Sequence, residues 1–175
     1  AGEGVMDFSA HSMIDTHSWH VEDGQIDAVA WAKFASEQLD EWGEVEQEPN
    51  MPLWHVAKEY GLRGPSFNCL TACAASTQAI GEATSVLVHG DADVMMTGGT
   101  HTMLHALGIT GFNRLTALST FDGDPRKASK PFSRDRAGFV MGEGSGALAL
   151  KRLSDAIRDG DRIHAVIRGV GASSD

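Results

Sequence analysis

A cysteine at a strand-to-helix junction is the feature that most constrains this chain. The stretch Gly64–Gly90 reads GPSFNCLTACAASTQAIGEATSVLVHG, in which a short apolar segment leads through Cys73 into small, helix-forming residues. We expect a strand at residues 66–72 and a helix at residues 73–88. The free N–H groups and the dipole at the helix start favour the thiolate of Cys73, the nucleophilic form. The alternative is an inert structural cysteine, which is what we expect of Cys69 within the apolar segment.

The elements around this junction follow from hydrophobic periodicity and turn residues. Helices are expected at 26–42, 53–60 and 153–160, and strands at 93–97, 147–150 and 163–170. Strand, helix and strand in succession over residues 66–97 are typical of an α/β layer with a parallel sheet. Residues 98–137 show little regular pattern.

The composition excludes several classes of function. A net charge of −10 disfavours nucleic acids and anionic lipids as partners. No apolar run is long enough to span a membrane, and two cysteines so close in sequence do not form a disulfide framework. We therefore expect a cytoplasmic protein of the α/β class with no membrane partner.

The glycine-rich stretch Gly138–Gly146 invites interpretation as a phosphate-binding loop. No Lys-Ser/Thr pair follows the glycines, however, and Ala147–Leu150 favours a strand instead of a helix start. A tight backbone turn is the better interpretation, since glycine allows positive φ and close approach. Glu143 in that turn is expected to be partly buried and to need polar partners.

Histidine pairs at two places have the spacing of metal ligands. His17 and His20 lie within one helical turn of each other, as do His101 and His105. Neither pair is accompanied by a third ligand. We therefore expect no metal centre, and no cofactor site is indicated elsewhere.

Four blocks of the sequence, in the same order, resemble the β-ketoacyl-acyl carrier protein synthases. These are the condensing enzymes of fatty acid and polyketide synthesis, also called ketosynthases. The resemblance is strong from Tyr60 to Asp175 and weaker before Tyr60. The blocks are Gly61–Pro65 with Thr71–Ser76, then Gly90–Gly99, Ala117–Thr120 and Pro131–Gly146.

The resemblance implies a thiolase-like fold, a layered α/β/α arrangement with a mostly parallel sheet. This chain would hold roughly one of the two repeats of that fold, and both of its ends look cut. Residues 1–175 would be part of the N-terminal half of a ketosynthase domain. Residues 1–59 would form a divergent helical and loop lead-in, and residues 60–175 the core that bears the nucleophile.

The activity implied by the resemblance is acyl transfer. Cys73 would accept an acyl group from an acyl carrier protein as a thioester, with its own N–H as one oxyanion donor. A malonyl-carrier thioester would then lose carbon dioxide, and its enolate would attack the acyl group in a Claisen condensation. No histidine here matches the two catalytic histidines of the family, so the chain alone would lack the second step.

The resemblance assigns supporting roles to several other residues. Those in the nucleophile and glycine-rich motifs would support the site, and apolar residues of the region 98–137 would line the acyl pocket. The supporting residues are Thr71, Ala72 and Glu143, and the pocket candidates are Met103, Leu107 and Phe112.

The implied partners are an acyl carrier protein, malonyl and acyl thioesters, and a second ketosynthase chain. Residues 66–72 are the candidate interface of a homodimer or a ketosynthase heterodimer, because an unpaired strand edge would otherwise be exposed. A basic patch that docks the acidic carrier would have to be local. Arg126, Lys127 and Lys130 are the candidates for it.

Other classes of function stay open. A non-catalytic partner subunit of the chain-length-factor type is disfavoured by the retained Cys73. A coenzyme A-dependent enzyme of the thiolase or chalcone-synthase type is disfavoured by the stretch Gly138–Gly144, which favours the carrier-protein branch. A metal-binding protein that uses the eight histidines is the weakest alternative.

Overall fold

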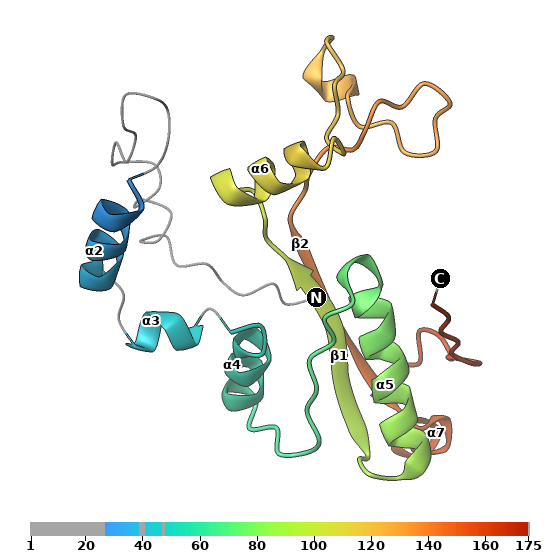
Figure 1. Ribbon diagram of the computed structural model, residues 1–175. Coiled ribbons are helices and arrows are strands. Elements are labelled where there is room, and N and C mark those ends of the chain that lie inside the picture. The colour runs from blue at the N-terminus through green and yellow to red at the C-terminus, as the bar shows by residue number, and fades with distance from the viewer. Residues whose placement is uncertain (1–26, 39–40, 47, 175) are drawn as a thin grey trace. The chain divides into compact units, whose positions relative to one another are not determined.

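The computed structural model describes residues 27–38, 41–46 and 48–174 (Figure 1). These residues divide into two compact units. The first unit comprises residues 48–101 and 144–174, and the second comprises residues 102–143 with the described residues before 47. Within the described part of the chain, no helix is both long enough and apolar enough to cross a lipid bilayer.

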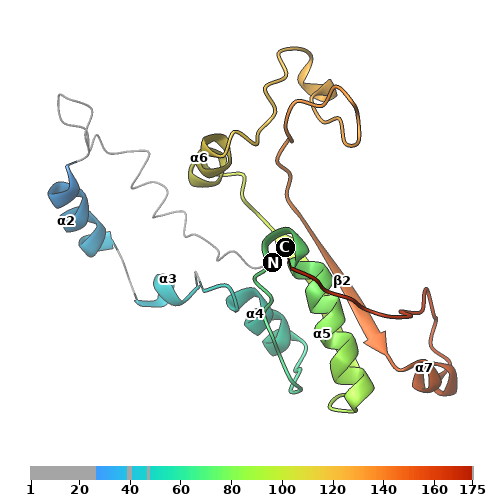
Figure 2. The same ribbon diagram turned by 45° about the vertical axis from the view of Figure 1, so that its right-hand side comes forward.

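The first unit is built on a pair of antiparallel strands. β1 (Val94–His101) pairs with β2 (Gly144–Lys151) over its whole length, from Val94 opposite Lys151 to His101 opposite Gly144. Helix α5 (Ala75–His89) packs mainly on β1 (Figure 1), and in the turned view it also lies beside β2 (Figure 2). Both strands were expected from the sequence, and each extends beyond its predicted bounds.

Small side chains let α5 pack closely on this sheet. Its buried positions recur at helical spacing and include Ala75, Ala83 and Leu87, of which Ala75 is fully buried. The helix ends at Gly90, whose φ of 84° is the left-handed conformation that glycine adopts at low cost. The helix expected at 73–88 is therefore confirmed, preceded by the short 3-10 turn η1 (Ala72–Ala74).

The other helices of the first unit also follow the sequence. Helix α4 (Met51–Glu59) carries a proline in its first turn and is followed by Gly61 at a φ of 62°. Helix α7 (Leu153–Asp159) ends at Gly160 in the left-handed conformation. Both were expected within two residues of these bounds.

The second unit contains helices α2 (Ala28–Gln38), α3 (Glu41–Glu46) and α6 (Ala106–Arg114) and the 3-10 turn η2 (Pro125–Lys127). Of the helix expected at 26–42, residues 28–38 form α2 and residues 41–42 begin α3, and residues 39 and 40 lie outside the described residues. Helix α6 was not expected, because it contains two glycines and its N-cap is His105, an uncommon residue at that position.

Two of the motif blocks lie side by side in the second unit. Leu118 and Phe139 form an isolated parallel bridge. The N–H of Ser119 donates to the carbonyl of Phe139 at 2.9 Å, and the N–H of Phe139 donates to that of Ala117 at 3.0 Å. The rings of Phe112 and Phe139 meet edge to face with centroids 5.3 Å apart.

Three expectations about the sheet were wrong for the described residues. Residues 66–71 and 163–170 are not strands, and the two strands present run antiparallel instead of parallel. A strand needs a partner for its backbone N–H and C=O groups, and neither segment has one in the described part of the chain. The later segment runs against α5, where a Cβ on Gly81 would lie 2.7 Å from Val170 Cγ1.

The tight turn expected in the glycine-rich stretch occurs at Gly138, which has a φ of 85°. A Cβ there would collide with the carbonyl group of Leu118. We expect Gly138→Ala to lower the free energy of unfolding by about 1–3 kcal/mol, through backbone strain and this collision. Gly142→Ala is the matched control, because nothing lies within 4 Å of a Cβ at Gly142. Urea unfolding followed by circular dichroism measures both, and equal stabilities would contradict the assignment.

Candidate functional site

Cys73 lies in η1, directly before the first turn of α5. The N–H of Ala74 donates to the carbonyl of Thr71 at 3.1 Å, which closes the turn that carries the thiol. The side chain of Cys73 is exposed, whereas that of Cys69 is half-buried, and both cysteines are free. The helix start expected beside Cys73 is confirmed, but the strand expected before it is not present, and the described residues do not bury Cys69 as a core residue.

The backbone directly before the thiol is strained. Ala72 has a φ of 48°, in the left-handed region that costs a non-glycine residue about 1–2 kcal/mol. Such residues cluster at functional sites, where the surrounding structure holds them in place. This turn presents the Cys73 thiol to solvent while the chain changes direction into α5. No residue-type signal in the sequence marks Ala72 for this conformation.

The N–H of Cys73 makes no hydrogen bond to another described backbone group. It is one of the amide groups at a helix start that lack an intrahelical partner. Acyl transfer to a thiol requires a hydrogen-bond donor near it that can stabilise the oxyanion, and this N–H is such a donor.

Glu143 is exposed, so the expectation that it would be partly buried was wrong. Its Oε1 accepts a hydrogen bond from the N–H of Leu104 at 3.3 Å. The carboxylate thus ties the end of the glycine-rich stretch to the segment that leads into α6. Within the second unit this is a structural contact.

The three pocket candidates lie in or next to α6, which also belongs to the second unit. Met103 precedes the helix, and Leu107 and Phe112 lie within it. Met103 and Phe112 are half-buried, and Phe112 packs on Phe139. Cys73, Thr71 and Ala72 belong to the first unit.

His101 and His105, one of the two pairs with metal-ligand spacing, lie in separate elements. His101 ends β1, and His105 caps α6 by accepting the N–H of Gly108 on its Nδ1 at 3.1 Å. His17 and His20 lie outside the described residues. Among the residues that the structure describes, no three His, Cys, Asp or Glu side chains group as metal ligands do.

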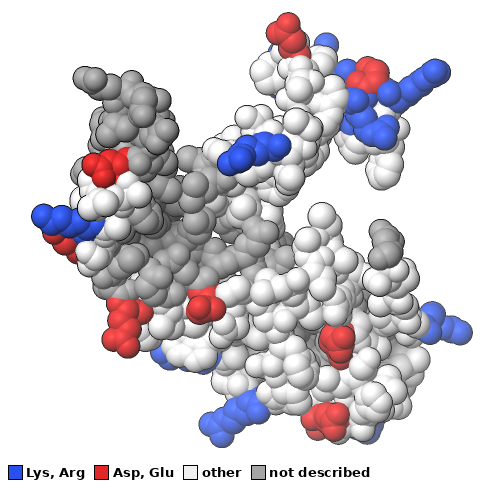
Figure 3. Space-filling model, in the orientation of Figure 1, with Lys and Arg blue, Asp and Glu red and all other residues white. Residues whose placement is uncertain are grey.

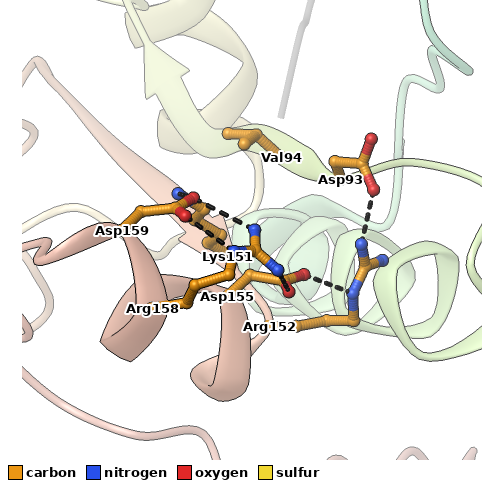
Figure 4. Close-up of a pocket in the computed structure, with 7 residues that line it drawn as sticks. All are labelled: Asp93, Val94, Lys151, Arg152, Asp155, Arg158 and Asp159. Carbon is orange, nitrogen blue, oxygen red and sulfur yellow. Dashed lines mark hydrogen bonds and ion pairs between the residues drawn. The ribbon is translucent and has the colours of Figure 1, made fainter.

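A recess of about 390 Å³ in the first unit is lined by charged residues (Figure 4). Arg152 is central to it and was not singled out from the sequence. Its guanidinium group pairs with Asp93 and with Asp155, and Nη1 donates to the carbonyl of Ala92 at 2.8 Å. Arg152 thereby joins α7 to the turn between α5 and β1. The basic residues that line the recess all pair with aspartates, so the recess offers a ligand no unpaired positive charge.

Asp159 completes this network from α7. Arg158 and then Lys151 donate hydrogen bonds to it, and these bonds lower its pKa from 3.8 to about 2. The Lys151 Nζ atom lies 2.6 Å from Asp159 and 2.7 Å from Asp161. The network therefore links the end of β2 to both ends of the turn that follows α7.

Basic side chains gather around η2 in the second unit (Figure 3). Arg126 forms two hydrogen bonds of 3.0 Å to Asp124. Lys130 pairs with Asp135 at 2.9 Å and lies over the ring of Phe121. Of the three residues expected to form a docking patch, two are thus paired within the loop.

Comparison with known proteins identifies the family. Residues 20–156 match the family described as β-ketoacyl synthase, N-terminal domain. The chain is 47% identical over 127 residues to the mitochondrial 3-oxoacyl-[acyl-carrier-protein] synthase of Arabidopsis thaliana. The aligned region covers 72% of this chain and 28% of that protein. It is 42% identical over 127 residues to the 3-oxoacyl-[acyl-carrier-protein] synthase 2 of Rhizobium meliloti (strain 1021). That alignment covers 72% of this chain and 30% of the relative.

Solved structures agree. A type II polyketide synthase acyl-carrier protein in complex with its ketosynthase, bound to the hexaketide, matches with a TM-score of 0.69 at 28% identity, over 88% of this chain and 36% of that one. A β-ketoacyl synthase from Burkholderia phymatum STM815 matches with a TM-score of 0.69 at 27% identity, over 80% of this chain and 35% of that one. The thiolase-like fold class is thereby confirmed.

The chain belongs to the β-ketoacyl synthase family, within its N-terminal domain. It spans less than a third of the length of the curated relatives named above, which are acyltransferases of the condensing type.

The charged network predicts how stability depends on pH. A carboxyl group whose pKa is lower in the folded state stabilises the fold above its unfolded pKa, near 3.8 for Asp159, and loses that contribution as the pH falls toward 2. We expect the Tm to fall between about pH 4 and pH 2, and to fall less steeply in Asp159→Asn. Asp91→Asn is the control, since the Asp91 carboxylate has no partner among the described residues. Identical pH profiles for all three proteins would contradict the role of Asp159.

Proposed function

We propose that this chain carries the nucleophile of a β-ketoacyl-acyl carrier protein synthase. Cys73 accepts an acyl group as a thioester, and an enolate formed by decarboxylation of a malonyl-carrier thioester then attacks that group. The exposed thiol of Cys73, at the strained turn before α5, is the observation that supports this role best. The acyl chains belong to fatty acid or polyketide synthesis.

The first step fits the groups around Cys73. The thiolate attacks the carbonyl carbon of the incoming thioester, and the carrier thiol leaves with a proton. The N–H of Cys73 donates to the oxyanion that forms between these two events. Thr71 and Ala72 hold the turn, while Met103, Leu107 and Phe112 contribute to the acyl pocket and Glu143 supports the glycine-rich stretch.

The second step needs hydrogen-bond donors for the enolate, and no motif of this chain matches the family residues that provide them. The enolate requires stabilisation at its oxygen, and the family uses two histidines for that purpose. We therefore assign the first half-reaction to this chain and the second to the complete enzyme. Residues 1–59 then serve as a lead-in and residues 60–175 as the core of the N-terminal half.

Intact-mass spectrometry after exposure to an acyl thioester tests the acyl-acceptor role. We expect one acyl adduct per chain, because a thiol at a helix start is a good nucleophile near neutral pH. The adduct is expected to disappear in Cys73→Ser and to remain in Cys69→Ser.

An adduct that depends equally on Cys69 would show that the thioester reacts without selectivity, and would contradict the proposal. If no adduct forms, the same measurement on a chain extended to the length of its relatives decides the matter. An extended chain that still forms no adduct at Cys73 would make it a structural cysteine.

We propose an acyl carrier protein as the partner, since one of the structural neighbours is in complex with its carrier protein. The η2 loop is the docking candidate, although Arg126 and Lys130 already pair with aspartates. Lys127 makes no ion pair with any described residue, so its charge is available to a partner. Lys127 is therefore the residue of this loop that we expect to contribute most.

Lys127→Glu is expected to weaken carrier-protein binding about threefold to fivefold at low salt, as loss and reversal of one exposed charge would do. Lys33→Glu on α2 is the matched control, because it changes the net charge equally at another element. Titration of the carrier protein at two salt concentrations measures both. Equal weakening in the two variants would indicate only a net-charge effect and would remove η2 from the docking surface.

We also propose that the protein pairs with a second ketosynthase chain through residues 66–72. Phe67 and Leu70 in this segment are more than half exposed. The backbone around them belongs to no helix or strand and has no strand partner in the described part of the chain, so its polar groups can accept another strand. The two free cysteines favour a reducing compartment such as the cytoplasm.

A further inference from the structure

Gly99 on β1 faces the first turn of α5 at unusually short range. A Cβ placed on Gly99 would lie 2.6 Å from the Cβ of Ser76 and 2.8 Å from its Oγ. Gly99 does not need glycine for its own backbone, because its φ lies outside the left-handed region. A glycine is therefore required at this position because Ser76 occupies the space that a side chain would need.

The neighbouring glycine of the sheet provides a contrast. Gly146 on β2 is the direct partner of Gly99 in the strand register. A Cβ on Gly146 would have nothing within 4 Å. The requirement for a glycine is thus specific to the β1 position that meets α5.

Ser76 is rigidly connected to the thiol. It lies one residue after Ala75, the fully buried first residue of α5. Cys73 lies within η1, which directly precedes Ala75. The atom that a larger residue would meet first is the Ser76 Cβ, which is attached directly to the helix backbone and cannot rotate away. Carbon atoms pack at about 3.5–4.0 Å, so a side chain at Gly99 would push the start of α5 outward by about 1 Å.

We propose that Gly99 is a positioning residue for Cys73. By allowing Ser76 to contact the backbone of β1, it sets the depth of the first turn of α5 and hence the place of the thiol relative to the amide groups of the turn. The inference rests on the proposed function, in which Cys73 is the acyl acceptor. A displacement of 1 Å at a reacting group can lower a rate by up to about 100-fold.

The test compares the 175-residue chain with Gly99→Ala, Gly146→Ala and the double variant Ser76→Gly/Gly99→Ala. The readout is the rate of iodoacetamide alkylation at Cys73 divided by the rate at Cys69, from peptide mass spectra at neutral pH. This ratio responds to the setting of Cys73, whereas general loosening of the fold accelerates both thiols. It does not depend on any acyl substrate.

We expect Gly99→Ala to lower the ratio by at least about threefold, since the outward shift of the first turn of α5 would move the thiol away from the amide groups at the helix start. Gly146→Ala is expected to leave the ratio unchanged. The double variant removes the two atoms nearest the new methyl group and leaves the Cα of residue 76 at 3.5 Å, an ordinary contact distance, so the ratio is expected to recover.

Three results would overturn the proposal: an unchanged ratio in Gly99→Ala, an equal loss in Gly146→Ala, or no recovery in the double variant. If Gly99→Ala unfolds, the double variant alone decides, because it restores the space. Should the ratio behave as expected while no acyl adduct forms at Cys73, the positioning role stands and the acyl-acceptor role fails.

Discussion

The close contact between α5 and the β1–β2 pair is the constraint on which the described structure depends. Alanines and glycines on both surfaces let the helix lie directly on the strand backbone, with Ala75 fully buried at its start. The same contact determines where η1 ends and therefore where Cys73 lies. The position of the thiol at the helix start thus depends on the packing of that helix on the sheet, which small residues make possible.

The charged network at the other end of α5 complements this contact. A rotation of the Arg152 side chain would break its bonds to α7, to Asp93 and to the carbonyls of two residues, Leu87 within α5 and Ala92 after it. One end of the helix is therefore held by direct packing and the other by hydrogen bonds. A helix fixed at both ends keeps a reactive residue in place better than one fixed by packing alone.

Local elements were predictable from the sequence, and their pairing was not. Helices α4, α5 and α7 carry periodic apolar residues and glycine stops, and β1 and β2 are apolar runs between turns. The pairing of β1 with β2 joins segments far apart in the chain, and periodicity contains no information about which strands meet. Residues 66–71 and 163–170 have the composition of strands, but a strand also needs a neighbour. Helix α6 was missed because its glycines and its histidine N-cap weaken the local signal.

The candidate site divides in the same way. Cys73 was predictable because a residue type, a turn and a helix start coincide in one short stretch. The positive φ of Ala72, the exposure of Glu143 and the spatial role of Gly99 were not, because each depends on a neighbour remote in sequence or on a backbone angle.

The register of β1 with β2 has a consequence for synthesis. Val94 cannot find Lys151 until the whole intervening segment has left the ribosome. Helix α5 and β1 are complete long before then, so they wait without β2 while residues 102–143 are being made. Helix α5 and β1 are thus made early and receive β2 late, so this interval is when we expect the nascent chain to be most prone to aggregate.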